Sequence, residues 1–145
     1  MPSFDPARLV AENYVHEVSV ETRFQDLDPL GHINNVALAG IFENGRVRFN
    51  RQLRGAHLAM QSGDRWLVAK VEINYLAEGH FPEPMMIRNA IGHIGNRSWQ
   101  ILSAAWQGDK IIGLCDAILV YQSASGAGAI SDALRAELTG LRLKA

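Results

Sequence analysis

Two carboxylates, one histidine and two consecutive asparagines occur within residues 26–35, a combination that can carry hydrolytic chemistry. Pro29 fixes its own φ angle and favours an extended backbone at Asp28, while Gly31 permits a conformation that is closed to other residues. The asparagines that follow are good helix caps, so Asp28 is brought toward the positive end of a helix dipole. A carboxylate there stays ionised at neutral pH, and free N–H groups of the helix can polarise a substrate carbonyl. The segment therefore predicts a hydrolytic site.

The residues on either side of this segment predict the elements that hold it. Residues 14–24 alternate between apolar and polar side chains, which indicates a half-buried strand. Residues 36–53 place apolar side chains at helical spacing, which predicts a long amphipathic helix. Gly40 and Gly45 are unfavourable inside a helix. We therefore expect a packing reason for them, namely a close approach of this helix to a concave sheet.

The rest of the chain predicts an antiparallel sheet. Asp5-Pro6 is typical of a helix start, and a turn-rich connection at 55–64 follows the long helix. The strand nearest the end of the chain is largely apolar on both faces, which suits a central or interface position. Ser131 caps a final helix. Turn residues separate predicted strands at 65–75, 85–94, 98–106 and 111–121. We expect an α+β protein in which a strongly curved antiparallel sheet wraps one long helix.

The composition narrows the possible functions. The 145 residues, 48% apolar and 20% charged, predict one domain over 1–145. A net charge of −1 gives no reason to expect nucleic acid or a membrane surface as a partner. The single cysteine, Cys115, excludes an intrachain disulfide, and the start of the chain lacks a signal-peptide pattern, so we expect a cytoplasmic protein. The histidines lack metal-ligand spacing, and Cys115 is expected to be a buried, inert thiol.

The motif also carries a family resemblance. The pattern Asp-x-Asp-x-x-Gly-His-x-Asn-Asn, followed by a helix with Glu43-x-x-Arg46, resembles the hotdog-fold acyl-CoA thioesterases of the 4-hydroxybenzoyl-CoA thioesterase type. The run from Asp28 to Asn35 is also similar to a segment of the plant acyl-carrier-protein thioesterases. The resemblance implies a hotdog fold and a homodimer or homotetramer with active sites at the subunit interface. It further implies hydrolysis of an acyl-CoA, or of an acyl chain on a carrier protein, without metal or organic cofactor.

The resemblance assigns roles to five residues of the motif. It implies that Asp28 attacks the thioester carbonyl or activates a water, and that His32 belongs to the catalytic set. Gly31, Asn34 and Asn35 are the expected substrate-binding residues, and the backbone N–H of Asn35 is expected to polarise the carbonyl.

Structural alternatives stay open for the same residues. Asp28 could simply close an Asx turn, and His32 could be satisfied by loop carbonyls. Asp26 is expected to be structural, bonded to backbone or to a basic partner. Two departures from the family patterns, Leu30 and Leu38, keep open a non-catalytic module that binds acyl thioesters.

Three other features need weighing. Glu43 lies about 12 Å along the helix from Asn35, too far for the same carbonyl, so an i,i+3 pair with Arg46 is expected. Residues 79–82, Gly-His-Phe-Pro, resemble a dehydratase motif. They follow the helix instead of preceding it, so a β-turn is the stronger interpretation and a dehydratase built on His80 the weaker one. The phosphates of coenzyme A could meet one of three arginines, and nothing in the sequence chooses among Arg48, Arg88 and Arg97.

Overall fold

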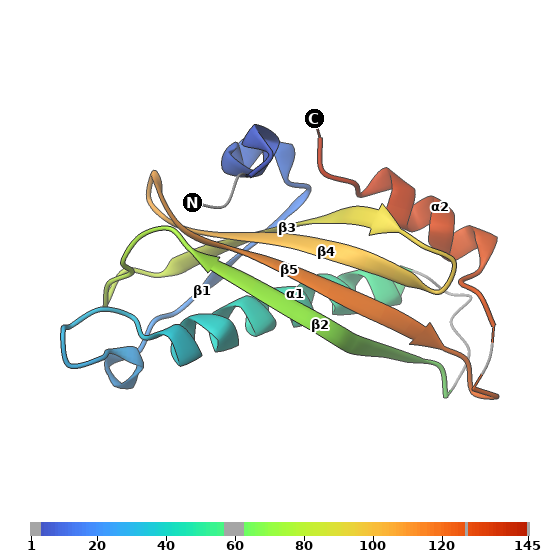
Figure 1. The fold of residues 1–145 in the computed structure, drawn as a ribbon, viewed down its shortest axis with the longest axis horizontal. Coiled ribbons are helices and arrows are strands. Elements are labelled where there is room, and N and C mark those ends of the chain that lie inside the picture. The colour runs from blue at the N-terminus through green and yellow to red at the C-terminus, as the bar shows by residue number, and fades with distance from the viewer. Residues whose placement is uncertain (1–3, 57–62, 127, 145) are drawn as a thin grey trace.

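The computed structural model of the protein describes residues 4–56, 63–126 and 128–144, and its strands form one antiparallel sheet (Figure 1). The strand order is β1-β3-β4-β5-β2. The strands are β1 His16–Val20, β2 Arg65–Tyr75, β3 Met85–Ile94, β4 Ser98–Gln107 and β5 Lys110–Gln122. The helices are α1 Asn35–Ala56 and α2 Asp132–Gly140, with short 3-10 helices η1 Pro6–Leu9, η2 Ala11–Asn13 and η3 Phe24–Asp26.

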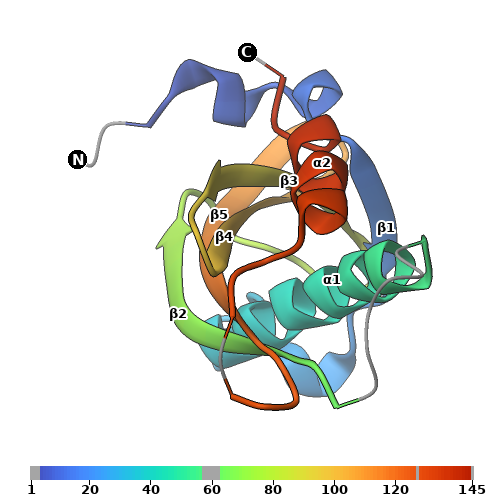
Figure 2. The ribbon, with the colours of Figure 1, turned by 90° about the vertical axis from the view of Figure 1, so that its right-hand side faces the viewer.

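The long helix α1 lies inside the curve of the sheet, and the N-terminal 3-10 segment lies on the opposite face (Figure 2). Phe42, on the inner stripe of α1, is fully buried in a cluster with Met85 and Ile87 of β3. Further along the helix, Phe49 packs with Leu134 of α2 in a second cluster. A curved antiparallel sheet around one long helix is the hotdog arrangement, as the sequence predicts.

The two helical glycines differ. A Cβ atom at Gly45 would lie 2.5 Å from the Ile87 side chain, and the Gly45 carbonyl accepts a hydrogen bond from the Asn89 side chain at 3.2 Å. The predicted close approach of helix and sheet is therefore confirmed at Gly45. At Gly40 the prediction is wrong, because this residue is exposed and a Cβ atom there would meet no described atom within 4 Å.

The sequence places most of the strands correctly but extends the first too far. β1 ends at Val20, since the chain turns into η3, and Phe24 is 74% exposed instead of half-buried. β5 lies between β4 and β2, so its central position is confirmed, and β2 forms an edge. The predicted connection at 55–64 falls largely outside the described residues.

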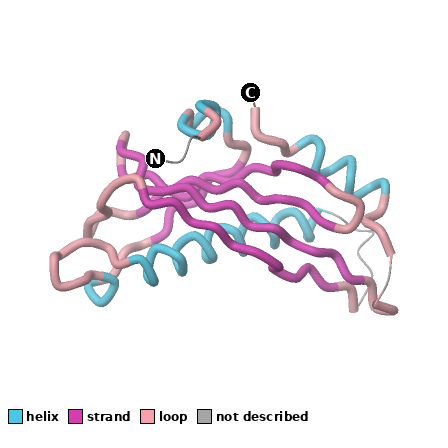
Figure 3. The backbone as a smooth tube through the Cα atoms, viewed as in Figure 1, coloured by secondary structure: helices cyan, strands magenta, loops and turns pink. Residues whose placement is uncertain are grey.

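Loops gather at the two ends of the sheet (Figure 3). Within the described residues, no helix is both long enough and apolar enough to cross a membrane. The motif loop (residues 27–34, between η3 and α1) and the β2–β3 loop (residues 76–84) lie together at one of these ends (Figure 1).

Candidate active site

The motif loop is closed by Asp28. Its Oδ1 accepts the N–H groups of Leu30 at 2.9 Å and of His32 at 3.1 Å. Its backbone exchanges hydrogen bonds with Gly31 and His32, and Gly31 has a φ of 81°, in the region that favours glycine. The Asx turn is therefore confirmed. It uses only one carboxylate oxygen, and Oδ2 makes no hydrogen bond within the described part of the chain.

Asn34 caps α1. Its Oδ1 accepts the N–H of Ala37 at 2.8 Å, and its own N–H and side-chain amide both donate to the Asp26 carbonyl at 2.8 Å. The next two N–H groups of the helix, at Asn35 and Val36, find no acceptor among the described residues. These are the free donors at the positive end of the helix dipole, where an oxyanion or carbonyl oxygen is stabilised.

Asp26 holds the loop from the other side, as expected. Its side chain is 5% exposed, accepts the Arg23 backbone N–H at 2.9 Å and pairs with the Arg23 guanidinium at 2.8 Å. This hydrogen bond raises the pKa of Arg23. The carboxylates of Asp26 and Asp28 therefore have separate partners: Asp26 binds Arg23, whereas Asp28 binds N–H groups of its own loop. The structure therefore confirms the structural role predicted for Asp26.

The loop between β2 and β3 forms the second half of the site. His32 Nε2 lies 3.1 Å from Oε2 of Glu78, and the His80 ring stands edge-on to His32 at 5.4 Å between centroids. Gly79 is buried, and its carbonyl accepts the Ile33 N–H at 2.8 Å. The structure thus confirms that the Gly-His-Phe-Pro run is a loop between strands, and it brings that loop against the motif.

Sequence reasoning missed Glu78 entirely and did not place His80 beside the motif. No local spacing signals this neighbourhood, because the contact joins residues that lie more than forty positions apart. The available hint was topological: the loop after β2 must return to the end of the sheet where the central helix begins.

A groove of about 500 Å³ runs along the first turns of α1. Asn34 lines this groove, whereas Asp28, Gly31, His32 and Asn35 do not. The helical residues that line it are Val36, Ala37, Gly40, Ile41 and Asn44. The predicted site residues thus divide between this groove and the surface formed by the two loops.

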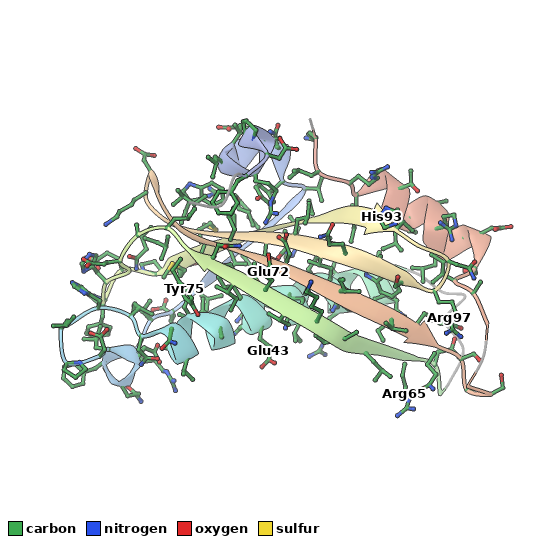
Figure 4. The ribbon with its side chains drawn as sticks, in the orientation of Figure 1. Glu43, Arg65, Glu72, Tyr75, His93 and Arg97 are labelled. Carbon is green, nitrogen blue, oxygen red and sulfur yellow. The ribbon has the colours of Figure 1, made fainter. Side chains whose placement is uncertain are left out.

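Large apolar side chains are exposed around the motif. Phe24 and Phe81 contact each other edge to face, with ring centroids 6.2 Å apart. Leu30 is 79% exposed and Val36 77%. Tyr75, at the end of β2 nearest these loops, is exposed as well (Figure 4). Apolar side chains that cluster around a site on a monomer indicate a surface that meets another molecule.

The expected pair between Glu43 and Arg46 is wrong. Arg46 is 5% exposed on the inner stripe of α1 and interacts with the Cys115 thiol, while Glu43 points away from the sheet (Figure 4). Cys115 is 1% exposed, and burial raises its pKa to about 11. The prediction of a buried, inert thiol is confirmed. No group of three potential metal ligands occurs among the described residues.

The three candidate arginines for a phosphate occupy different places. Arg97 lies at the far end of the sheet from the motif loop (Figure 4). Arg88 pairs with Glu17 at 3.1 Å and lies over the Trp106 ring. Arg48 is exposed on the outer face of α1, at the edge of a second shallow pocket. None of the three lies in the groove or in the two loops.

Comparison with known protein families decides the relationship. Residues 22–124, which run from the end of β1 past the end of β5, match the family described as the thioesterase-like superfamily. The chain belongs to this superfamily. A comparison with curated protein sequences gives no match.

Solved structures support the same superfamily fold. The PA5185 protein of Pseudomonas aeruginosa is 26% identical with a TM-score of 0.76, and the match covers 93% of this chain and 96% of that one. A thioesterase superfamily protein from Jannaschia sp. CCS1 is 24% identical with a TM-score of 0.76, covering 91% and 87%. A thioesterase from Thermus thermophilus, solved with coenzyme A and zinc, is 24% identical with a TM-score of 0.73, covering 90% and 96%.

Proposed function

We propose that this protein is an acyl-CoA thioesterase of the 4-hydroxybenzoyl-CoA type, with an acyl carrier protein as the alternative thiol carrier. The observation that carries the proposal is the join between the motif loop and α1. There an aspartate lies in the loop that leads into the start of a helix, and within the described residues one of its carboxylate oxygens and the first helical N–H groups have no hydrogen-bond partner. Membership of the thioesterase-like superfamily supports it.

Each motif residue has a task in the proposed reaction. Asp28 attacks the thioester carbonyl carbon directly or removes a proton from an attacking water. The carbonyl oxygen accepts the Asn35 N–H, which stabilises its developing negative charge. The C–S bond then breaks, and His32 supplies a proton to the departing thiolate. Where Asp28 has attacked directly, water then hydrolyses the acyl–aspartyl anhydride and regenerates the carboxylate. Because a thioester is already activated, this scheme requires no metal or organic cofactor. The products are a carboxylic acid and a free thiol.

Gly31 and Asn34 act through backbone geometry in this scheme. Gly31 allows the loop to turn so that Asp28 accepts the His32 N–H, and the Asn34 cap binds the N–H of Ala37, the third residue of the helix. The cap leaves the Asn35 N–H as the donor for substrate. We therefore assign both residues to the substrate-binding set.

A second copy of the chain is part of the proposal. β2 is an edge strand of eleven residues on which Val68 and Val71 remain exposed, and Tyr75 continues this surface toward the motif. An edge of that length invites pairing with another strand. We propose at least a homodimer, in which a neighbouring subunit covers the exposed apolar side chains and completes a pocket for the acyl chain.

The test is a hydrolysis screen. The purified protein is incubated with acyl-CoAs that vary in chain length, branching and aromaticity, and free thiol is measured. We expect turnover with at least one of them, together with a mass in solution of at least two chains. If the protein binds acyl-CoA but releases free thiol from none of the acyl-CoAs and from no acyl carrier protein, the result would contradict hydrolysis and favour a binding module. Formation of an enoyl product that depends on His80 would favour a dehydratase.

A further inference from the structure

His32 is held by a carboxylate that the motif does not contain. Its Nε2 atom lies 3.1 Å from Oε2 of Glu78 in the β2–β3 loop. From the geometry we infer that Glu78 is a positioning residue, which selects the His32 tautomer with hydrogen on Nε2 and a free lone pair on Nδ1. The inference rests on the proposed thioesterase function.

The chemistry of the pair selects this tautomer. An ionised carboxylate only accepts hydrogen bonds, so the Nε2 atom that faces Glu78 must carry the hydrogen. Nδ1 makes no hydrogen bond within the described part of the chain. It is therefore the ring atom that can exchange a proton with water or with a thiolate. In histidine generally, the hydrogen bond made by one ring nitrogen determines whether the other nitrogen carries a hydrogen.

The loop that carries Glu78 is fixed to the motif. The Gly79 carbonyl accepts the Ile33 N–H at 2.8 Å, and a Cβ atom at Gly79 would lie only 3.2 Å from the Ile33 side chain. On the next residue, the Gln107 side chain binds both backbone groups of His80, at 2.8 and 2.7 Å. Glu78 is thus presented by an anchored backbone.

The arrangement connects Glu78 to the proposed nucleophile or base. Glu78 binds the His32 ring, and the His32 backbone N–H donates to Asp28 Oδ1 at 3.1 Å. During hydrolysis, the proton that Asp28 removes from the attacking water passes on to Nδ1 of His32. The doubly protonated ring stays bound to Glu78 and then gives the Nδ1 proton to the thiolate sulfur as the C–S bond breaks. The ring returns to the Nε2–H tautomer that Glu78 selects.

The His80 ring limits the movement of the His32 ring by steric contact. Its imidazole stands at 85° to that of His32, with centroids 5.4 Å apart, which restricts tilting of His32 without a hydrogen bond. The Glu78 side chain is 64% exposed, and such pairs contribute little to folding. We therefore expect its effect in the state of the ring and in turnover, and not in stability.

The experiment reads the His32 tautomer directly, from ¹⁵N chemical shifts of the imidazole at pH 8, with a His32→Ala spectrum for assignment. The wild type is expected to show the Nε2–H form, and Glu78→Ala a mixture of tautomers. Glu78→Gln keeps an oxygen that accepts the Nε2 hydrogen, so it is expected to restore much of the wild-type pattern. Glu83→Gln removes a charge from the same loop and serves as the matched control with an unchanged spectrum.

Turnover provides the second readout. With the best acyl-CoA, Glu78→Ala is expected to lower kcat about tenfold at unchanged KM, since proton transfer by a mispositioned ring is slower. Glu78→Gln should recover most of this loss. A Glu78→Ala spectrum identical to the wild type would overturn the inference, and so would an unchanged kcat. If the wild type hydrolyses no thioester, the proposed function fails, and the ¹⁵N spectra still report whether Glu78 controls the ring.

Discussion

The inner face and the outer face of α1 use glycine in opposite ways. Gly45 allows the helix to lie against β3, where even one added carbon would collide with Ile87. Gly40, five residues earlier, faces open space and lines the groove beside the motif. The inner face is specified by packing, whereas a Cβ atom at Gly40 on the outer face would meet no described atom within 4 Å. The difference shows that the inner face of α1 stabilises the fold, while the outer face near its amino end is available to a ligand or a second subunit.

The largest stability effect is expected under the inner face, at Cys115. Burial raises its pKa to about 11, so above the ordinary thiol pKa the unfolded chain loses this proton while the folded chain keeps it. Stability is therefore intact below the unfolded pKa and falls as pH rises toward the folded one, by about 2 to 3 kcal/mol in total. Urea unfolding between pH 8 and 10.5 should show a steeper decline for the wild type than for Cys115→Ala. Equal slopes would contradict the burial of this thiol.

The next effect distinguishes the two glycines. Gly45→Ala should destabilise the protein by about 1 to 3 kcal/mol, because the new methyl group overpacks the contact with Ile87. The measurement is the urea midpoint at constant m-value. A neutral or stabilising result would show that helix and sheet can separate without cost.

A smaller loss is expected at the amino end. Asn34→Ala removes the cap of α1 and the side-chain bond to the Asp26 carbonyl, which should cost about 0.5 to 2 kcal/mol. Thioester hydrolysis should fall more than stability, since the helix start that donates to the substrate loses its anchor. Unfolding free energy and kcat/KM are measured on the same preparation. A loss confined to stability would separate the cap from the site.

The smallest effect has the opposite sign. Gly40→Ala should stabilise the protein by about 0.5 to 1 kcal/mol, because alanine is the better helix former and the site is open. The free energies of unfolding of Gly40→Ala and Gly45→Ala, each measured by urea unfolding, test the difference between the outer and inner faces of α1 directly. Destabilisation by Gly40→Ala would mean that the outer face is already packed.

The sequence predicts the fold better than the site, and particular residues show why. The period of the apolar side chains locates α1 and the four later strands, because burial follows directly from secondary-structure geometry. The first strand is extended too far, since the Arg23–Asp26 contact turns the chain and no apolar pattern encodes it. The i,i+3 spacing predicts a pair between Arg46 and Glu43, but the position of Arg46 on the inner stripe of α1 directs it toward Cys115.

The site shows the limit of local patterns. The Asx turn of Asp28, the helix cap of Asn34 and the structural role of Asp26 could be predicted because their partners lie within a few residues along the chain. Glu78 could not, because it reaches His32 only after β2 has crossed the sheet and the chain has turned back. Contacts between distant loops depend on topology and leave no spacing to recognise.

The central claim is that one carboxylate beside the amino end of α1 cleaves a thioester, and Asp28→Asn tests it most directly. Asparagine keeps the oxygen that accepts the Leu30 and His32 N–H groups, so the loop should remain folded while the charge is lost. We predict that kcat/KM for the best acyl-CoA falls at least about 100-fold, with an unchanged urea midpoint, whereas Glu43→Gln on the outer face of α1 stays near the wild type. Turnover by Asp28→Asn within about threefold of the wild type would contradict the account.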